Sequence, residues 1–108
     1  MYYITVKSYF SAAHRLRNYK GNCENIHGHN WKVKVTAGFK ELDDSGMAID
    51  FRELKQITEE ILEKLDHKDI NKLDYFKEKN PTSENIAEYI FNETPGYAIP
   101  LHEVKVFA

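Results

Sequence analysis

Histidines gather in one short part of the sequence. His27 and His29 stand one residue apart within Cys23-Glu24-Asn25-Ile26-His27-Gly28-His29, and His14 lies a short way upstream. Side chains alternate along an extended strand, so His27 and His29 point to the same side. Gly28 removes bulk between them and lets the backbone bend toward whatever the imidazoles bind. Three imidazoles from two neighbouring strands, without a fourth protein ligand, are typical of a catalytic zinc site with one open position.

Cys23, the first residue of this segment, leaves two alternatives open. In the C-x3-H-x-H spacing, Cys23 is near enough to be a fourth zinc ligand, which would close a structural site. It is equally near enough to stand beside the metal as an unligated thiolate that the cation stabilises. Spacing alone does not decide between these two roles of Cys23. Glu24, the next residue, reads on its own as an exposed loop carboxylate.

Composition narrows the class of protein. The chain has 108 residues, enough for one domain, with 42% hydrophobic and 30% charged residues, which is ordinary for a soluble globular protein. A net charge of -2 argues against a general nucleic-acid binder. The single cysteine fits a reducing compartment, and no stretch resembles a signal peptide or a membrane span. We therefore expect a cytoplasmic protein with no nucleic-acid or membrane partner.

Alternating patterns predict the strands that position the histidines. Residues 2–10 alternate in polarity and lead through a small-residue run to His14. Residues 31–39 alternate in the same way directly after the second motif, and residues 15–26 between them read as a loop. Antiparallel pairing of these two strands would bring His14 beside His27 and His29 near one end. Residues 101–107 predict a third strand.

Two helices are expected between the second and third strands. Residues 41–46 read as a turn, since Asp43 and Asp44 favour turn positions, and Asp50 then caps a helix with Glu53 in capping-box position. Its apolar face is predicted to contain Phe51, Leu54, Ile57, Ile61, Leu62 and Leu65. Thr82 is the expected N-cap of the second helix, whose core face is Ile86, Ala87, Ile90 and Phe91. The order of elements predicts an α+β fold.

An adjacent Asp66-His67 pair ends the first helix. Beside a zinc site such a pair gains interest, because a carboxylate can fix the tautomer of an imidazole and raise its basicity. We therefore predict an acid/base role for both residues.

Together these motifs resemble one family. Phe10-x-Ala12-Ala13-His14-x-Leu16, C-x3-HGH and Asp66-His67, with Met47–Phe51 and Asn80–Asn85, are similar to the 6-pyruvoyltetrahydropterin synthase / 6-carboxytetrahydropterin synthase family over essentially the whole chain. The short gap between the cysteine and HGH is similar to the bacterial carboxytetrahydropterin branch, which supplies queuosine (7-deazapurine) biosynthesis.

The resemblance implies a fold, an assembly and a reaction. The fold is the tunnelling fold (T-fold), an antiparallel sheet with two helices on one face, whose subunits form a β-barrel oligomer, usually a homo-hexamer built as a dimer of trimers. The reaction takes 7,8-dihydroneopterin triphosphate to 6-carboxy-5,6,7,8-tetrahydropterin, with release of triphosphate and acetaldehyde.

The resemblance also implies roles for particular residues. One Zn²⁺ per subunit would be held by His14, His27 and His29. The catalytic residues would be Cys23, Asp66 and His67, with Glu24 as an alternative in members that yield a 6-hydroxymethyl pterin for the folate pathway. Substrate contacts would come from Thr82, Ser83 and Glu84. The triphosphate would meet Arg15, Arg17 or Lys20, among which no motif chooses.

Three further expectations accompany this interpretation. In the family the third strand leads into a glutamate that anchors the pterin ring and then into a fourth strand, and Ala108 aligns with that glutamate. We therefore expect either a truncated chain, or Glu103 or Glu84 in its place. A zinc hydrolase that activates water with the same histidines is a rival class. A zinc- or pterin-binding protein without turnover is the other.

Overall fold

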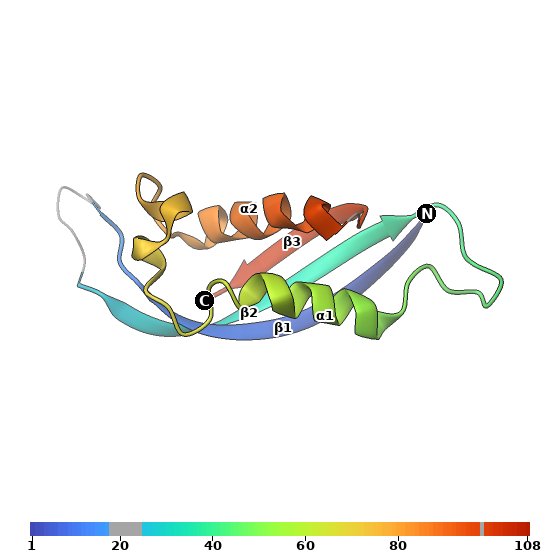
Figure 1. The fold of residues 1–108 in the computed structure, drawn as a ribbon, viewed down its shortest axis with the longest axis horizontal. Helices are drawn as coiled ribbons and strands as arrows, with labels where there is room; N and C mark the ends of the chain where they lie inside the picture. Colours follow the sequence, from blue (N-terminus) through green and yellow to red (C-terminus); the bar gives the residue numbers. More distant parts are fainter. Residues whose placement is uncertain (18–24, 98) are drawn as a thin grey trace.

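The three strands form one antiparallel sheet. The computed structural model describes residues 1–17, 25–97 and 99–108. Strands β1 (Tyr2–His14), β2 (His27–Phe39) and β3 (Leu101–Phe107) lie in the order β1-β2-β3 (Figure 1). The β1–β2 ladder runs from Tyr2 opposite Phe39 to His14 opposite His27. The predicted pairing of the first two strands is confirmed, and both strands reach further toward the histidines than the alternating runs alone.

One face of this sheet carries the core. In β1 the buried residues alternate, from Val6 through Ser8, Phe10 and Ala12 to His14. In β2, Trp31, Val33, Val35 and Ala37 are buried in the same way. The period of two therefore carries His14 to the face on which the hydrophobic core lies. A histidine at the end of an apolar stripe is partly withdrawn from water.

Helices α1 (Phe51–Leu62) and α2 (Ser83–Glu93) cover that face (Figure 1). Asp50 and Thr82 are the N-caps, as predicted: the Asp50 carboxylate accepts the Arg52 N–H at 2.8 Å, and the Thr82 hydroxyl accepts the Asn85 N–H at 3.1 Å. The helices contribute Leu54, Ile61, Leu62, Ile86 and Ile90 to the core.

Two of the predicted core residues are exposed instead. Phe91 is 40% and Phe51 59% exposed. Ile86 and Ile90 define the buried stripe of α2, and the next residue after Ile90 is turned about 100° away from it. Phe51 lies in the first turn of α1, at the end of the packed stripe.

The segment between the helices follows the outer edge of β1. His67 donates its N–H to the Ser11 carbonyl at 2.6 Å, and the Ala13 N–H donates to the Lys68 carbonyl at 2.9 Å. Asp69 forms a parallel bridge with Ala13. Two short 3-10 helices, η1 (Ile70–Lys72) and η2 (Asp74–Phe76), come next in this segment. A third, η3 (Thr94–Tyr97), follows α2. The sequence did not predict these three elements. These bonds place the Asp66-His67 pair at the histidine end of the sheet.

None of the helices in the described part of the chain is long and apolar enough to cross a membrane.

Candidate metal centre and active site

The three histidines converge. One nitrogen from each of His14, His27 and His29 lies within 4.8 Å of the others. Their ring centroids are separated by 4.7 to 5.1 Å. The β1–β2 register sets His14 opposite His27, and His29 lies two residues further along the same face of β2. The prediction that these side chains meet is confirmed.

Backbone carbonyls orient two of these rings. His14 Nδ1 donates to the Pro81 carbonyl at 2.7 Å, and His27 Nδ1 donates to the Asn25 carbonyl at 3.0 Å. A carbonyl only accepts, so the proton of each neutral ring is on Nδ1 and the lone pair is on Nε2. Metal-binding histidines are usually oriented in this way by an outer hydrogen bond. The donor set fits a zinc ion with three nitrogen ligands.

Trp31 packs beneath the rings. Its side chain is 1% exposed, and its ring centroid lies 4.9 Å from that of His14 and 5.5 Å from that of His29. Phe10 stacks nearly parallel to it at 5.8 Å. The indole Nε1 is buried and has no hydrogen-bond partner among the described residues. His14 and His29 therefore pack on a buried aromatic side chain, which restricts rotation of their imidazoles.

Asp66 holds His67. The carboxylate accepts the Ser11 N–H at 2.9 Å through Oδ1 and contacts His67 Nδ1 at 2.9 Å through Oδ2. The hydrogen bond from the Ser11 N–H lowers the pKa of Asp66, partial burial opposes this, and the hydrogen bond with His67 lowers it further. An ionised Asp66 keeps the proton of neutral His67 on Nδ1 and the lone pair on Nε2.

The backbone of His67 is unusual. Its φ of 57° lies in the left-handed region, which non-glycine residues rarely adopt. The His67 N–H bond to the Ser11 carbonyl holds it there. Such conformations persist where surrounding contacts determine them, and they are frequent at functional sites.

His29 and His67 line the same cavity. Its volume is about 500 Å³, and Ser11, Lys68 and Asp69 also form part of its wall. His67, from the segment after α1, and His29 of β2, far apart in sequence, therefore meet at one space. A substrate there could contact a bound metal ion on one side and the His67 ring on the other.

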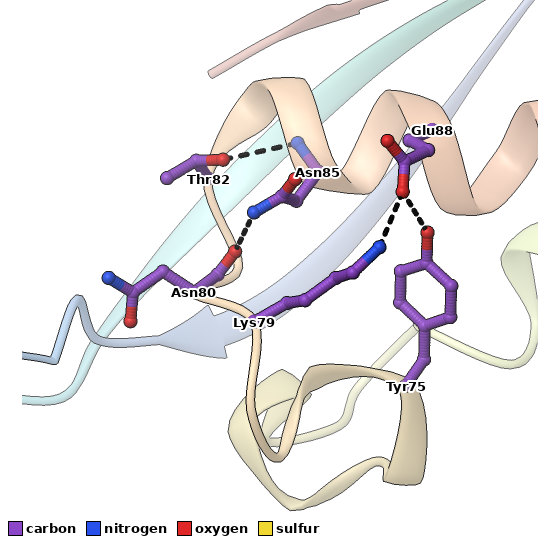
Figure 2. A network of polar contacts seen from close by, with 6 residues as sticks. All are labelled: Tyr75, Lys79, Asn80, Thr82, Asn85 and Glu88. Carbon is purple, nitrogen blue, oxygen red and sulfur yellow. Dashed lines mark hydrogen bonds and ion pairs between the residues drawn. The ribbon is translucent and has the colours of Figure 1, made fainter.

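A network of polar contacts fixes the approach to α2 (Figure 2). The Asn85 side chain donates to the Asn80 carbonyl at 2.8 Å while its N–H donates to the Thr82 hydroxyl. Pro81, whose carbonyl holds His14, lies between Asn80 and Thr82 and is thereby positioned.

The same loop is tied to the exposed side of α2. Glu88 Oε1 accepts from Tyr75 Oη at 2.6 Å and from Lys79 Nζ at 2.7 Å (Figure 2). The hydrogen bonds from Lys79 and from Tyr75 lower the pKa of Glu88. The ionised Glu88 thus anchors both ends of residues 75–79 next to the site.

The remaining predicted residues fall into two groups. Thr82, Ser83 and Glu84 lie at the start of α2, with Thr82 as the cap and Glu84 exposed. Their contact with substrate stays a prediction. Cys23, Glu24 and Lys20 lie outside the described residues, so their roles stay predictions as well.

Sequence reasoning missed several residues that build the site. They are the Pro81 carbonyl, the Asn25 carbonyl, Asn71 and Asn80, all of which act through backbone or amide hydrogen bonds. A backbone carbonyl has no signature in a sequence, and an asparagine near a proline reads only as a turn. The Asn80-Pro81 pair was the one available signal.

Comparisons with known proteins agree with this geometry. The sequence profile of the 6-pyruvoyl tetrahydropterin synthase family matches residues 3–107. A putative 6-carboxy-5,6,7,8-tetrahydropterin synthase from Archaeoglobus fulgidus is 38% identical over 103 residues, which cover 95% of this chain and 84% of that protein. A 6-pyruvoyl tetrahydrobiopterin synthase from Poecilia reticulata is 36% identical, covering 94% and 83%.

The fold of the chain also resembles that of a solved structure. The 6-pyruvoyl tetrahydropterin synthase of Caenorhabditis elegans superposes with a TM-score of 0.76 at 28% identity, covering 99% of this chain and 96% of that one. The match extends over the sheet, both helices and the histidine end. The chain belongs to the 6-pyruvoyl tetrahydropterin synthase family of pterin synthases.

Proposed function

We propose that this protein converts 7,8-dihydroneopterin triphosphate to 6-carboxy-5,6,7,8-tetrahydropterin, with release of triphosphate and acetaldehyde, in a zinc-dependent lyase reaction. The observation that carries the proposal is the cavity shared by His29, from the zinc-type histidine cluster, and by His67. The name of the Archaeoglobus relative supports this choice of product. Synthesis of a 6-pyruvoyl product is the second candidate, because a relative of similar identity carries that name.

The histidines would hold the metal and the substrate's side chain together. A zinc ion bound by His14, His27 and His29 would supply Lewis-acid polarisation of side-chain oxygens. The hydrogen bonds from His14 and His27 to backbone carbonyls keep the two rings aimed at the cluster. The buried Trp31 excludes water from beneath the rings of His14 and His29.

Two further residues would move protons. His67, with its lone pair on Nε2, accepts a proton from the substrate, and the ionised Asp66 stabilises the imidazolium that forms. We assign the second base to Cys23 from its place in the C-x3-HGH motif. Glu24 takes over catalysis in the folate-type alternative, and Thr82, Ser83 and Glu84 contact the pterin.

We also propose assembly into a homo-hexamer in which the sheets form a barrel. The helices cover one face of the sheet only, and the other carries exposed aromatic side chains, among them Tyr3 at 53% and Tyr9 at 64%. Light scattering after size exclusion should give about six times the mass of the chain. A monomer at micromolar concentration would contradict the assembly.

The decisive experiment identifies the products. Zinc-loaded protein is incubated with dihydroneopterin triphosphate, the pterin is analysed by mass spectrometry, and aldehyde is measured in parallel. A 6-carboxy pterin with acetaldehyde establishes the proposal. A 6-pyruvoyl pterin supports the second candidate, and a 6-hydroxymethyl pterin supports the folate-type reaction through Glu24. Stoichiometric pterin binding without any product would make the protein a binder.

Matched variants separate the roles. His29→Ala should lose both zinc and turnover, whereas His102→Ala, at a solvent-exposed histidine of β3, should keep both. Cys23→Ala should lose turnover and keep zinc. Loss of zinc from that variant would make Cys23 a ligand, and full turnover would favour a water-activating hydrolase.

A further inference from the structure

A dense set of hydrogen bonds joins Arg17 to the loop before α2. The Arg17 guanidinium donates to the carbonyls of Phe76, of Lys77 at 2.8 Å and of Lys79 at 2.7 Å. The backbone of Arg17 is held as well, because the Asn80 amide accepts its N–H at 2.8 Å and donates to its carbonyl at 2.9 Å. A single residue just beyond the end of β1 thus binds the loop through three main-chain carbonyls and one amide.

These contacts depend on the shape of an arginine. A guanidinium presents five N–H donors in a rigid plane and can bond to several carbonyls at once, whereas an ammonium is a point donor on a flexible stem. Both terminal nitrogens of Arg17 are engaged with carbonyls, and the residue is half-buried. By resemblance Arg17 is one of the cations that could meet a triphosphate, but its terminal nitrogens already face its own chain.

The loop that Arg17 binds also carries the carbonyl that orients His14. Pro81 follows Asn80, and its carbonyl accepts from His14 Nδ1 at 2.7 Å. A proline has no N–H, so Pro81 cannot be anchored through a donor of its own and takes its position from its neighbours. The Thr82 N–H donates across it to the Asn80 carbonyl at 2.8 Å. The direction of the Pro81 carbonyl therefore follows the position of Asn80, which Arg17 holds.

The two attachments join the same two segments at neighbouring positions. His14 and Arg17 lie on the segment that leaves β1, and Pro81 and Asn80 are adjacent on the loop before α2. The His14 side chain is 7% exposed, so its bond to the Pro81 carbonyl is shielded from water. A shielded bond is costly to lose, because water cannot replace it.

We propose that Arg17 is a positioning residue of the metal centre: by binding residues 76–80 it holds the Pro81 carbonyl against His14 Nδ1 and so keeps Nε2 of His14 directed at the metal. The inference rests on the proposed function through its metal site and deepens it. Loss of an outer hydrogen-bond partner of a metal-binding histidine typically weakens metal binding roughly 10- to 100-fold. Arg17 acts on such a partner from one step away, so its loss should have an effect of about tenfold.

The test measures metal affinity apart from turnover. Co²⁺ is titrated into the metal-free protein, and its dissociation constant is obtained by competition with a chelator. Arg17→Gln should bind Co²⁺ about tenfold more weakly than the parent protein. Arg17→Lys keeps the charge but lacks the planar fork, so its affinity should fall by a similar factor. Parent affinity in either variant would overturn the inference.

Two matched controls separate this effect from lost charge and from lost stability. Arg52→Gln removes an arginine whose side chain is 92% exposed and pairs with Asp50. Ile61→Val removes one carbon from the core beneath α1 and lowers the unfolding midpoint. Both variants should keep the Co²⁺ affinity of the parent. A loss in Ile61→Val as large as that in Arg17→Gln would reduce the role of Arg17 to general stability and overturn the inference.

A double variant tests the route through Asn80. Asn80→Ala removes the amide that holds the backbone of Arg17, so it should also weaken Co²⁺ binding. Because both residues act through the same loop, the combined variant should lose much less than the product of the two factors. Factors that multiply in full would mean that the two residues act independently, which contradicts the proposed route.

Nitrogen NMR of the His14 imidazole provides a readout without any metal. In the parent the proton should lie on Nδ1, whereas in Arg17→Gln part of it should move to Nε2. An unchanged tautomer would contradict the route through Pro81, and a raised KM for dihydroneopterin triphosphate with parent Co²⁺ affinity would assign Arg17 to the triphosphate instead. If the parent protein binds no Co²⁺, the proposed metal centre and reaction fail, and the tautomer of His14 still decides whether Arg17 orients it.

Discussion

Replacement of Asp66 by asparagine should change which nitrogen of His67 carries the proton. In the parent protein the carboxylate accepts the Ser11 N–H through Oδ1 and the His67 Nδ1 proton through Oδ2. In Asp66→Asn the amide oxygen keeps the bond to Ser11, because only an oxygen can accept there. The amide nitrogen then faces His67 Nδ1 and can only donate, so the ring must move its proton to Nε2.

The size of the effect follows from these contacts. A base that presents N–H in place of its lone pair loses the contribution of general base catalysis, typically 10²- to 10⁴-fold, or about 2.7 to 5.5 kcal/mol of activation free energy. The free energy of unfolding should change by no more than about 1 kcal/mol, because the bond to Ser11 is kept and the carboxylate is partly exposed. Zinc content should not change, since Asp66 and His67 lie outside the histidine cluster.

Three measurements check this. Turnover is measured by mass spectrometry of the pterin product, metal content by elemental analysis, and the tautomer of His67 by nitrogen NMR of the imidazole. Asp74→Asn is the matched control: Asp74 is 95% exposed and pairs with Lys77 at 2.9 Å in η2, so turnover should stay at the parent level. Turnover of Asp66→Asn within about threefold of the parent, with the tautomer changed, would refute the assignment of His67 as base.

Three other outcomes are expected. Trp31 is the only tryptophan and lies 4.9 Å from His14, so Co²⁺ titrated into metal-free protein should quench its fluorescence to saturation at one equivalent, reversibly with chelator; quenching without saturation would count against the site. Ile86→Ala should lower the free energy of unfolding by about 2 to 5 kcal/mol in urea, because Ile86 is fully buried, and a loss below about 1 kcal/mol would mean that α2 is not anchored there. The pKa of Asp66 is lowered, chiefly by the Ser11 N–H, so its stabilising contribution is complete above about pH 4 and is lost as the pH falls through the lowered pKa. Asp66→Asn should therefore flatten part of the acid limb of a stability–pH profile, and superimposable profiles would contradict this reasoning.

Local patterns determined much of the fold. Alternation in residues 2–10 and 31–39 predicted the two long strands and their buried faces, and Asp50 and Thr82 predicted where both helices begin. These features depend on a period of two or 3.6 residues and on a single capping side chain, all of which can be read within a short window. The same local information placed His14, His27 and His29 on strands and predicted that they meet.

The tertiary structure decided how the rest of the site is built. The edge of β1 binds residues 66–69, which carries His67 to the cavity of His29, and the Pro81 carbonyl reaches His14 from the start of α2. It also decided that Arg17 donates through its guanidinium to the Lys77 carbonyl, whereas Arg15 bonds to Asn71 through its backbone, although the two residues look alike in the sequence. These contacts join positions 55 to 67 residues apart through backbone groups that every residue possesses, so no side-chain pattern announces them.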